Sequence, residues 1–99
     1  MSVKAHVILR PTDICLEIIK SRLRPRVDMG LEGCEALLLV QGSVAEIIEI
    51  VDIVTKVVNV KAAEIVGNCP QQFNTIVFWG STADVEQAVV VLKERGKIA

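Results

Sequence analysis

The chain has 99 residues, of which 52% are hydrophobic and only 3% aromatic, and its formal net charge at pH 7 is -1. This length suits a single domain over residues 1–99, because a second hydrophobic core would not fit, and the apolar content excludes disorder. The balanced charge gives no field that would attract nucleic acid or an anionic membrane. No apolar run in the sequence approaches the roughly 20 residues of a membrane helix.

Nearly all of the hydrophobic excess consists of Val, Ile, Leu and Ala. A small domain leaves roughly a third of its unfolded-chain surface exposed after folding, so some of these aliphatic side chains must reach the surface. We therefore expect another subunit to cover part of it. The N-terminal residues lack the long apolar stretch of a signal peptide, and Cys15, Cys34 and Cys69 form no CxxC motif. These features favour the cytosol and argue against a disulfide framework.

Short apolar and β-rich runs predict four strands, over residues 4–10, 35–41, 61–66 and 74–79. The second run is nearly all apolar, so both faces of that strand should be buried. Periodic apolar positions predict three helices, over residues 14–23, 44–59 and 81–95. The order β-α-β-α-β-β-α predicts an α+β fold (an α/β sandwich) in which the helices cover one face of the sheet.

Local signals mark the helix ends. Capping residues stand before each helix: Thr12 or Asp13, then Ser43 with Glu46, then Ser81 with Asp84. The first helix should end before Pro25, because the residue preceding a proline avoids the helical region. Residues 24–33 then form the one long connector.

Three stretches resemble the shell-protein domain of bacterial microcompartments (the BMC domain). They are Asp52-x-x-x-Lys56-x-x-Asn59-Val60, residues 65–89 (IVGNCPQQFNTIVFWGSTADVEQAV), and residues 5–11 (AHVILRP), which are similar to the family's His-Val-Ile-Pro-Arg-Pro strand. The last of these segments ends the usual family member but comes first here. The order matches the circularly permuted branch of the family, and the resemblance implies a four-stranded antiparallel sheet with helices.

The resemblance implies a structural subunit rather than an enzyme, located in the microcompartment shell of the bacterial cytoplasm. Such subunits form cyclic hexamers that tile edge to edge, so the implied partners are other copies of the chain, other shell proteins and the encapsulated enzymes. By the same resemblance, Lys56 is the hexamer-edge lysine, and Asn59 and Arg10 also fall at edge positions. The alternative is that Lys56 only closes a polar helix face and pairs with Asp52 at i, i+4.

The resemblance also identifies a pore loop, made of Gly67, Asn68, Cys69, Pro70 and Gln71 and followed by Gln72. In a hexamer, six copies of Cys69 would surround one axis, and thiolates are the ligands of iron–sulfur clusters. Because four-thiolate ligation cannot obey six-fold symmetry, a cluster would use a subset of the six.

The Cys-Pro pair in this loop resembles a divergent subgroup from glycyl-radical propanediol microcompartments. That likeness implies an iron–sulfur cluster on Cys69, shared between subunits, for electron transfer across the shell or for gating metabolite passage. The alternative is that Cys69 is a small filler in a turn.

The remaining reactive side chains fit structural roles. We expect Cys15 and Cys34 to behave as small buried hydrophobes, His6 to be structural, and Trp79 to pack in the core or an interface. No nucleophile–base pair or paired-carboxylate motif is present in the sequence, so no catalytic residue is predicted. A different reading of the whole chain is a small cytosolic ferredoxin-like sensor domain that binds a small ligand at a subunit interface.

Overall fold

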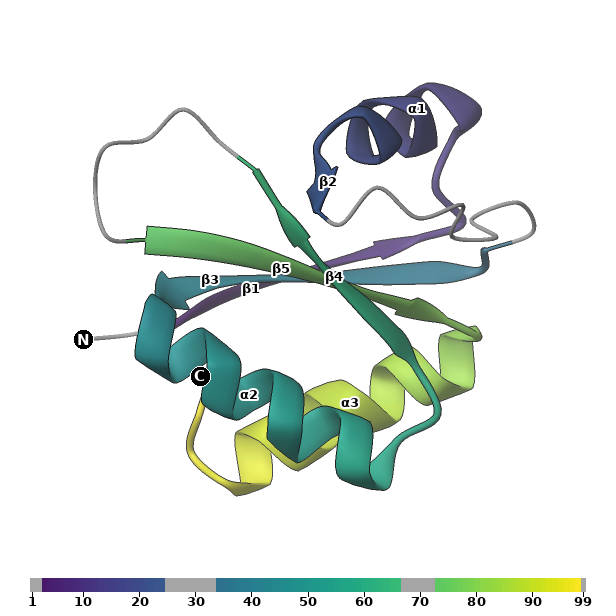
Figure 1. Ribbon diagram of the computed structural model, residues 1–99. Coiled ribbons are helices and arrows are strands. Elements are labelled where there is room, and N and C mark those ends of the chain that lie inside the picture. The colour runs from purple at the N-terminus through teal and green to yellow at the C-terminus, as the bar shows by residue number, and fades with distance from the viewer. Residues whose placement is uncertain (1–2, 25–33, 67–72, 99) are drawn as a thin grey trace.

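The computed structural model describes residues 3–24, 34–66 and 73–98 (Figure 1). In chain order its elements are β1 (Lys4–Leu9), α1 (Asp13–Ser21), β2 (Leu23–Arg24), β3 (Ala36–Ser43), α2 (Val44–Val57), β4 (Lys61–Ile65), β5 (Phe73–Gly80) and α3 (Thr82–Glu94). The strands form one sheet in the order β1-β3-β5-β4-β2, and every neighbouring pair is antiparallel. The predicted α+β class, its three helices and its four strands are confirmed.

The structure adds one strand to the predicted set. Helix α1 was expected to continue to residue 23, but it ends at Ser21, and Leu23 and Arg24 pair with Ile65 and Glu64 of β4. The Val66 N–H extends this contact by donating to the Arg22 carbonyl over 2.7 Å. This pairing joins segments that lie about 40 residues apart in the sequence, so no local sequence pattern predicts it.

The three helices lie on both faces of the sheet rather than on one. Helices α2 and α3 cover one face, and α1 lies over the other (Figure 1). The prediction that the helices cover one face was therefore wrong for α1. The physical reason is the alternation along the central strands: Leu38 packs into the core beneath α2 and α3, while Leu37 packs into the core beneath α1.

The two cores differ in size. The larger core combines buried residues of α2, α3 and the sheet face that they cover: Val3, Ala36, Leu38, Val40, Ile47, Ile50, Val54, Val58, Ile76, Phe78, Val85, Ala88 and Leu92. The smaller core lies under α1 and contains Ile19, Leu23, Leu37, Ala63, Val77 and Trp79. Helix α1 contributes only Ile19 as a fully buried side chain, so it is held to the sheet less extensively than α2 and α3.

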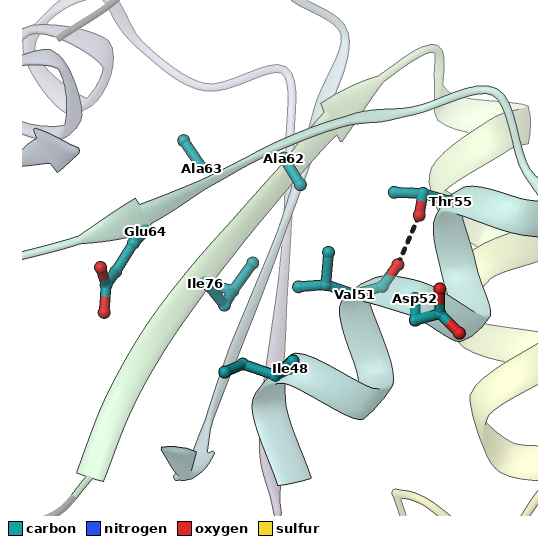
Figure 2. A pocket seen from close by; sticks show the side chains of 8 residues that line it. All are labelled: Ile48, Val51, Asp52, Thr55, Ala62, Ala63, Glu64 and Ile76. Atoms are coloured by element: carbon teal, nitrogen blue, oxygen red, sulfur yellow. Dashed lines mark hydrogen bonds between the residues drawn. The ribbon is translucent and has the colours of Figure 1, made fainter. Parts of the chain in front are cut away.

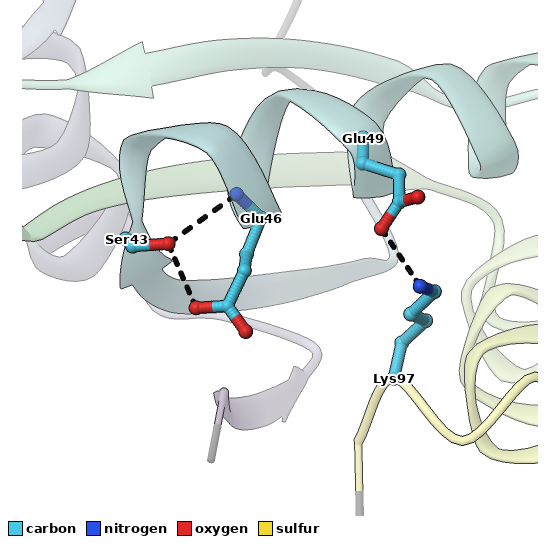
Figure 3. A network of polar contacts seen from close by, with 4 residues as sticks. All are labelled: Ser43, Glu46, Glu49 and Lys97. Atoms are coloured by element: carbon cyan, nitrogen blue, oxygen red, sulfur yellow. Dashed lines mark hydrogen bonds and ion pairs between the residues drawn. The ribbon is translucent and has the colours of Figure 1, made fainter. Parts of the chain in front are cut away.

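The predicted caps are present at all three helix starts. The Thr12 hydroxyl accepts from the Cys15 N–H, and the Ser81 hydroxyl accepts from the Asp84 N–H at 3.1 Å. At α2, the Ser43 hydroxyl accepts from the Glu46 N–H and donates to the Glu46 carboxylate over 2.8 Å (Figure 3). These contacts satisfy backbone N–H groups that would otherwise have no partner in the first turn.

The C-terminal segment returns to α2. Lys97 Nζ lies 2.7 Å from Glu49 Oε1, which links the residues after α3 to the outer face of α2 (Figure 3). Gly96 takes a positive φ of 68°, a conformation that suits glycine at the end of a helix. The Lys97 N–H donates to the Leu92 carbonyl at 2.8 Å and completes the termination of α3.

Candidate functional site

The structure places the three predicted edge residues at one end of the sheet. Arg10 directly follows β1, and its N–H donates to the Glu35 carbonyl at 2.8 Å, just before β3 begins. Asn59 lies between α2 and β4, and its carbonyl oxygen is 3.6 Å from the point where a Cβ on Gly80 would stand. Lys56 belongs to the last turn of α2, three residues before Asn59. All three side chains are exposed.

Arg10 has an unusual backbone. Its φ is 49°, in the left-handed region that glycine occupies at lower cost. Within the described part of the chain, its guanidinium forms no ion pair. This backbone conformation costs about 1–2 kcal/mol, which the surrounding structure must offset.

Lys56 forms the local contact that the sequence suggested as the alternative to an edge role. Its Nζ lies 2.7 Å from Asp52 Oδ2, and the two side chains are 70% and 61% exposed. An exposed pair at this spacing contributes only about 0.3–0.5 kcal/mol. The ion pair therefore orients the ammonium group without removing it from solvent, and the edge role stays a prediction.

The predicted pore loop, including Cys69, lies outside the described residues, but the hairpin that carries it is described. Strands β4 and β5 pair from Lys61↔Trp79 to Ile65↔Thr75. Near the loop, Asn74 Nδ2 donates to Glu64 Oε2 over 2.6 Å. The two strands are thus fixed to each other where they enter and leave residues 67–72.

The loop-bearing end and the Arg10 end are opposite ends of the sheet. Strand β5 begins at Phe73, next to residues 67–72, and ends at Gly80, which pairs with Ala36 beside Leu9. A strand of this length spans about 23 Å. The described residues that flank the predicted loop, Val66 and Phe73, therefore lie at the end of the sheet opposite the predicted edge residues.

An open groove lies between α2 and the β4–β5 hairpin (Figure 2). Its volume is about 440 Å³, and it is lined by Ile48, Val51, Asp52, Thr55, Ala62, Ala63, Glu64 and Ile76. Most of the lining is aliphatic, with the carboxylates of Asp52 and Glu64 as its charged groups. Sequence analysis did not identify this groove. The available signal was Ile48, an additional apolar residue outside the core-facing stripe of α2, which is 63% exposed.

Several other large hydrophobic side chains are exposed. On β1 these are Val7 and Leu9, at 45% and 53% exposure, and on α1 they are Ile14 and Ile18. This agrees with the expectation from composition that aliphatic side chains reach the surface. Contiguous exposed apolar groups commonly mark interaction surfaces.

Cys15 and Cys34 are free and half-buried, and both pack against the smaller core. Burial raises the pKa of the Cys34 thiol above its ordinary value, although hydrogen bonds to the backbone of Ala36 and Gly80 oppose the shift. The Cys34 thiol donates to the Ala36 carbonyl over 3.2 Å. These contacts agree with the structural role expected for both cysteines.

Trp79 is only 6% exposed and belongs to the smaller core, as predicted. His6 instead lies exposed on the edge strand β1. Among residues 3–24, 34–66 and 73–98, no group of three or more His, Cys, Asp or Glu side chains is placed to hold a metal ion. Over the same residues, every helix is too short or too polar to cross a membrane.

Comparison with known proteins identifies the fold. No protein-family profile matches the sequence, and no curated protein matches it. The ligand-free GrpU microcompartment shell protein from Pectobacterium wasabiae superposes with a TM-score of 0.69, at 23% identity, over 91% of this chain and 99% of that chain. The ligand-free GrpU microcompartment shell protein from Clostridiales bacterium 1_7_47FAA gives a TM-score of 0.66, at 22% identity, over 94% of each chain. This chain therefore shares the fold of these two shell proteins over nearly its whole length.

Proposed function

We propose that this chain is a structural shell subunit of a bacterial microcompartment in the cytoplasm, and that it assembles with itself and with other shell proteins around encapsulated enzymes. The observation that carries the proposal is the likeness to two microcompartment shell proteins, which covers 91% and 94% of this chain. The circular permutation and the kinship with the glycyl-radical propanediol subgroup belong to the same proposal, and they rest on the order of the sequence motifs.

The layout of the sheet supports a hexameric ring. If residues 67–72 line a central pore, the opposite end of the sheet points outward, and that end carries Arg10, Asn59 and Lys56. Side chains at the perimeter can meet those of the next hexamer. The guanidinium of Arg10, which forms no ion pair with another described residue, and the accessible ammonium of Lys56 suit that position, because both can bind carbonyl or carboxylate oxygens of a neighbour.

The pore is proposed to hold an iron–sulfur cluster through Cys69. The donor set of one chain fits such a cluster only in part, because the loop carries one cysteine and the described residues contain no cluster of three or more metal-ligating side chains. Ligation would therefore need Cys69 from several subunits, which a ring supplies. When bound, such a cluster transfers single electrons; without it, the same loop would gate the passage of small metabolites.

Anaerobic purification tests the cluster, and electron microscopy tests the shell role. We expect wild-type protein to contain iron, to absorb visible light and to form extended sheets. Cys69→Ser should lose the iron and keep the ring, whereas Cys15→Ser and Cys34→Ser should keep both, because those thiols lie in the smaller core. A colourless, iron-free wild-type protein contradicts the cluster. A wild-type protein that forms no ring contradicts the shell role itself.

A further inference from the structure

Glu35 lies where three elements of the fold meet at one end of the sheet. It directly precedes β3, and its backbone carbonyl accepts from the N–H of Arg10, the residue that follows β1, at 2.8 Å. Its carboxylate oxygen Oε1 accepts from the backbone N–H of Thr82, the first residue of α3, at 3.1 Å. Glu35 therefore connects the segment after β1 to a helix whose first residue lies 47 positions later in the sequence.

The contact with Thr82 caps α3 from outside the helix. Thr82 is the first helical residue, so its N–H is one of the groups that no carbonyl of the same helix can reach. The local cap serves a different group, since the Ser81 hydroxyl accepts from the Asp84 N–H. The positive end of the helix dipole attracts a carboxylate, and a hydrogen bond to an ionised acceptor is stronger than one between neutral groups. The Glu35 side chain is therefore held against the start of α3.

The backbone of Arg10 depends on the position of Glu35. The pair Leu9↔Ala36 is the last in the β1–β3 ladder, and the bond from the Arg10 N–H to the Glu35 carbonyl lies just beyond it. Arg10 has a φ of 49°, which a residue with a side chain adopts only where its surroundings hold it. A displacement of Glu35 would free the Arg10 N–H and release this conformation.

The two side chains are also used separately. Within the described part of the chain, the Arg10 guanidinium forms no ion pair, although the residue bonded to its N–H carries a carboxylate. That carboxylate binds the Thr82 N–H instead. The contact with α3 thus fixes Glu35 and leaves the guanidinium available to a group outside the described chain.

We propose that Glu35 is a positioning residue for Arg10. Its carboxylate docks on the start of α3, and its carbonyl, fixed in this way, holds the backbone from which the guanidinium projects. The consequence for sheet formation rests on the proposed function, in which Arg10 contacts the next hexamer. The hold of Glu35 on the Arg10 backbone is a property of the single subunit and can be measured by itself.

Two substitutions remove the docking contact from opposite sides. Glu35→Ala removes the acceptor. Thr82→Pro removes the N–H donor at a position where proline suits a helix, and Ser81 before it is extended, with φ -69° and ψ 158°, as a residue preceding proline prefers. Ser81→Ala is the matched control, because it removes the local cap of the same helix and leaves the Glu35–Thr82 contact in place. Glu35→Gln is the conservative variant, because its amide oxygen can still accept from Thr82.

The direct readout is hydrogen exchange of the Arg10 amide, resolved to single residues by mass spectrometry. The Val58 amide, which donates to the Val54 carbonyl at the end of α2, is the internal reference. Circular dichroism establishes folding, native mass establishes the ring, and electron microscopy records the sheets.

We expect Glu35→Ala and Thr82→Pro to speed exchange at Arg10 about tenfold, because each removes one hydrogen bond to a charged group. Both variants should keep the ring and lose the sheets. Glu35→Gln should exchange within about threefold of the wild type, because a neutral acceptor keeps about half of the strength of the bond. Ser81→Ala should leave exchange at Arg10 and sheet formation unchanged.

Unchanged exchange at Arg10 in folded Glu35→Ala and Thr82→Pro proteins overturns the positioning role. An equal increase in Ser81→Ala also overturns it, because any weakening of α3 would then free Arg10. Normal sheets in spite of faster exchange overturn the link between the held backbone and the edge contact. A failure of the proposed function looks different: Arg10→Ala would then form normal sheets, while exchange at Arg10 would still rise in the Glu35→Ala protein.

Discussion

Two isoleucines of α2 offer a direct test of the larger core, because they differ in burial and in little else. Ile50 is 1% exposed and belongs to the larger core, whereas Ile48 is 63% exposed beside the groove. Ile50→Ala removes three carbon groups, worth about 0.8 kcal/mol each on transfer from water, and leaves a cavity. Alanine returns about 0.4 kcal/mol through its higher helix propensity. We expect a net loss of about 3 kcal/mol in the free energy of unfolding.

At 4–8 °C per kcal/mol for a domain of this size, this loss lowers the Tm by about 12–24 °C. The assay is urea unfolding followed by the fluorescence of Trp79, which is the single tryptophan and is buried in the other core. Ile48→Ala is the matched control and should change the free energy of unfolding of the dissociated chain by less than about 0.5 kcal/mol. A loss below about 1 kcal/mol for Ile50→Ala, or equal losses for both variants, would refute the assigned packing of α2.

Four further predictions follow from single contacts. Arg10→Gly should raise the free energy of unfolding by about 1 kcal/mol in a urea titration, because glycine adopts the positive φ of this position at lower cost. The same variant should abolish the sheets seen by electron microscopy. A less stable variant would contradict backbone strain at Arg10. Lys56→Ala should keep hexamers by native mass and lose sheets, with stability unchanged within about 0.5 kcal/mol; normal sheets would rule out its edge role. Ser43→Ala should cost about 1 kcal/mol in thermal unfolding, and Ser21→Ala, whose hydroxyl caps no N–H group, much less; equal costs would contradict the cap. Burial raises the pKa of the Cys34 thiol above 9.0, so the neutral thiol stabilises the fold at lower pH, and this contribution is lost as the pH rises through the folded-state pKa. In urea titrations between pH 7 and 10.5, the free energy of unfolding should therefore fall more steeply for the wild type than for Cys34→Ala. Parallel curves for the two proteins would exclude the effect.

The features that the sequence predicted well are encoded locally. The caps at Thr12, Ser43 and Ser81 each depend on a side chain and an N–H group within three residues, so a short motif is sufficient to identify them. The four main strands were recognised for a similar reason, since short runs rich in apolar and β-branched residues that end near Pro or Gly predict strands.

The features that were missed depend on contacts between distant segments. Strand β2 exists only because Leu23 and Arg24 meet β4, and α1 changes face because the sheet is apolar on both sides. The run Leu37–Val40 already indicated burial on both faces, which requires a cover on each. Applied consistently, that signal would have placed a helix on the second face.

The candidate site was predictable in its parts but not in its layout. The motifs named Arg10, Lys56 and Asn59, but only the folded structure shows that they lie near one end of the sheet, opposite the end where β5 begins at Phe73. The α2–β4 groove had no motif at all, because it arises where a helix and a hairpin from separate segments leave a gap.

The subunit count tests the central claim most directly. Native mass spectrometry of the anaerobically purified 99-residue chain, at several protein concentrations, gives this count without depending on the cluster or on sheet formation. The proposed shell role predicts a dominant species of six subunits. A stable species of two, three or four subunits would contradict it and favour a small ligand-binding sensor domain.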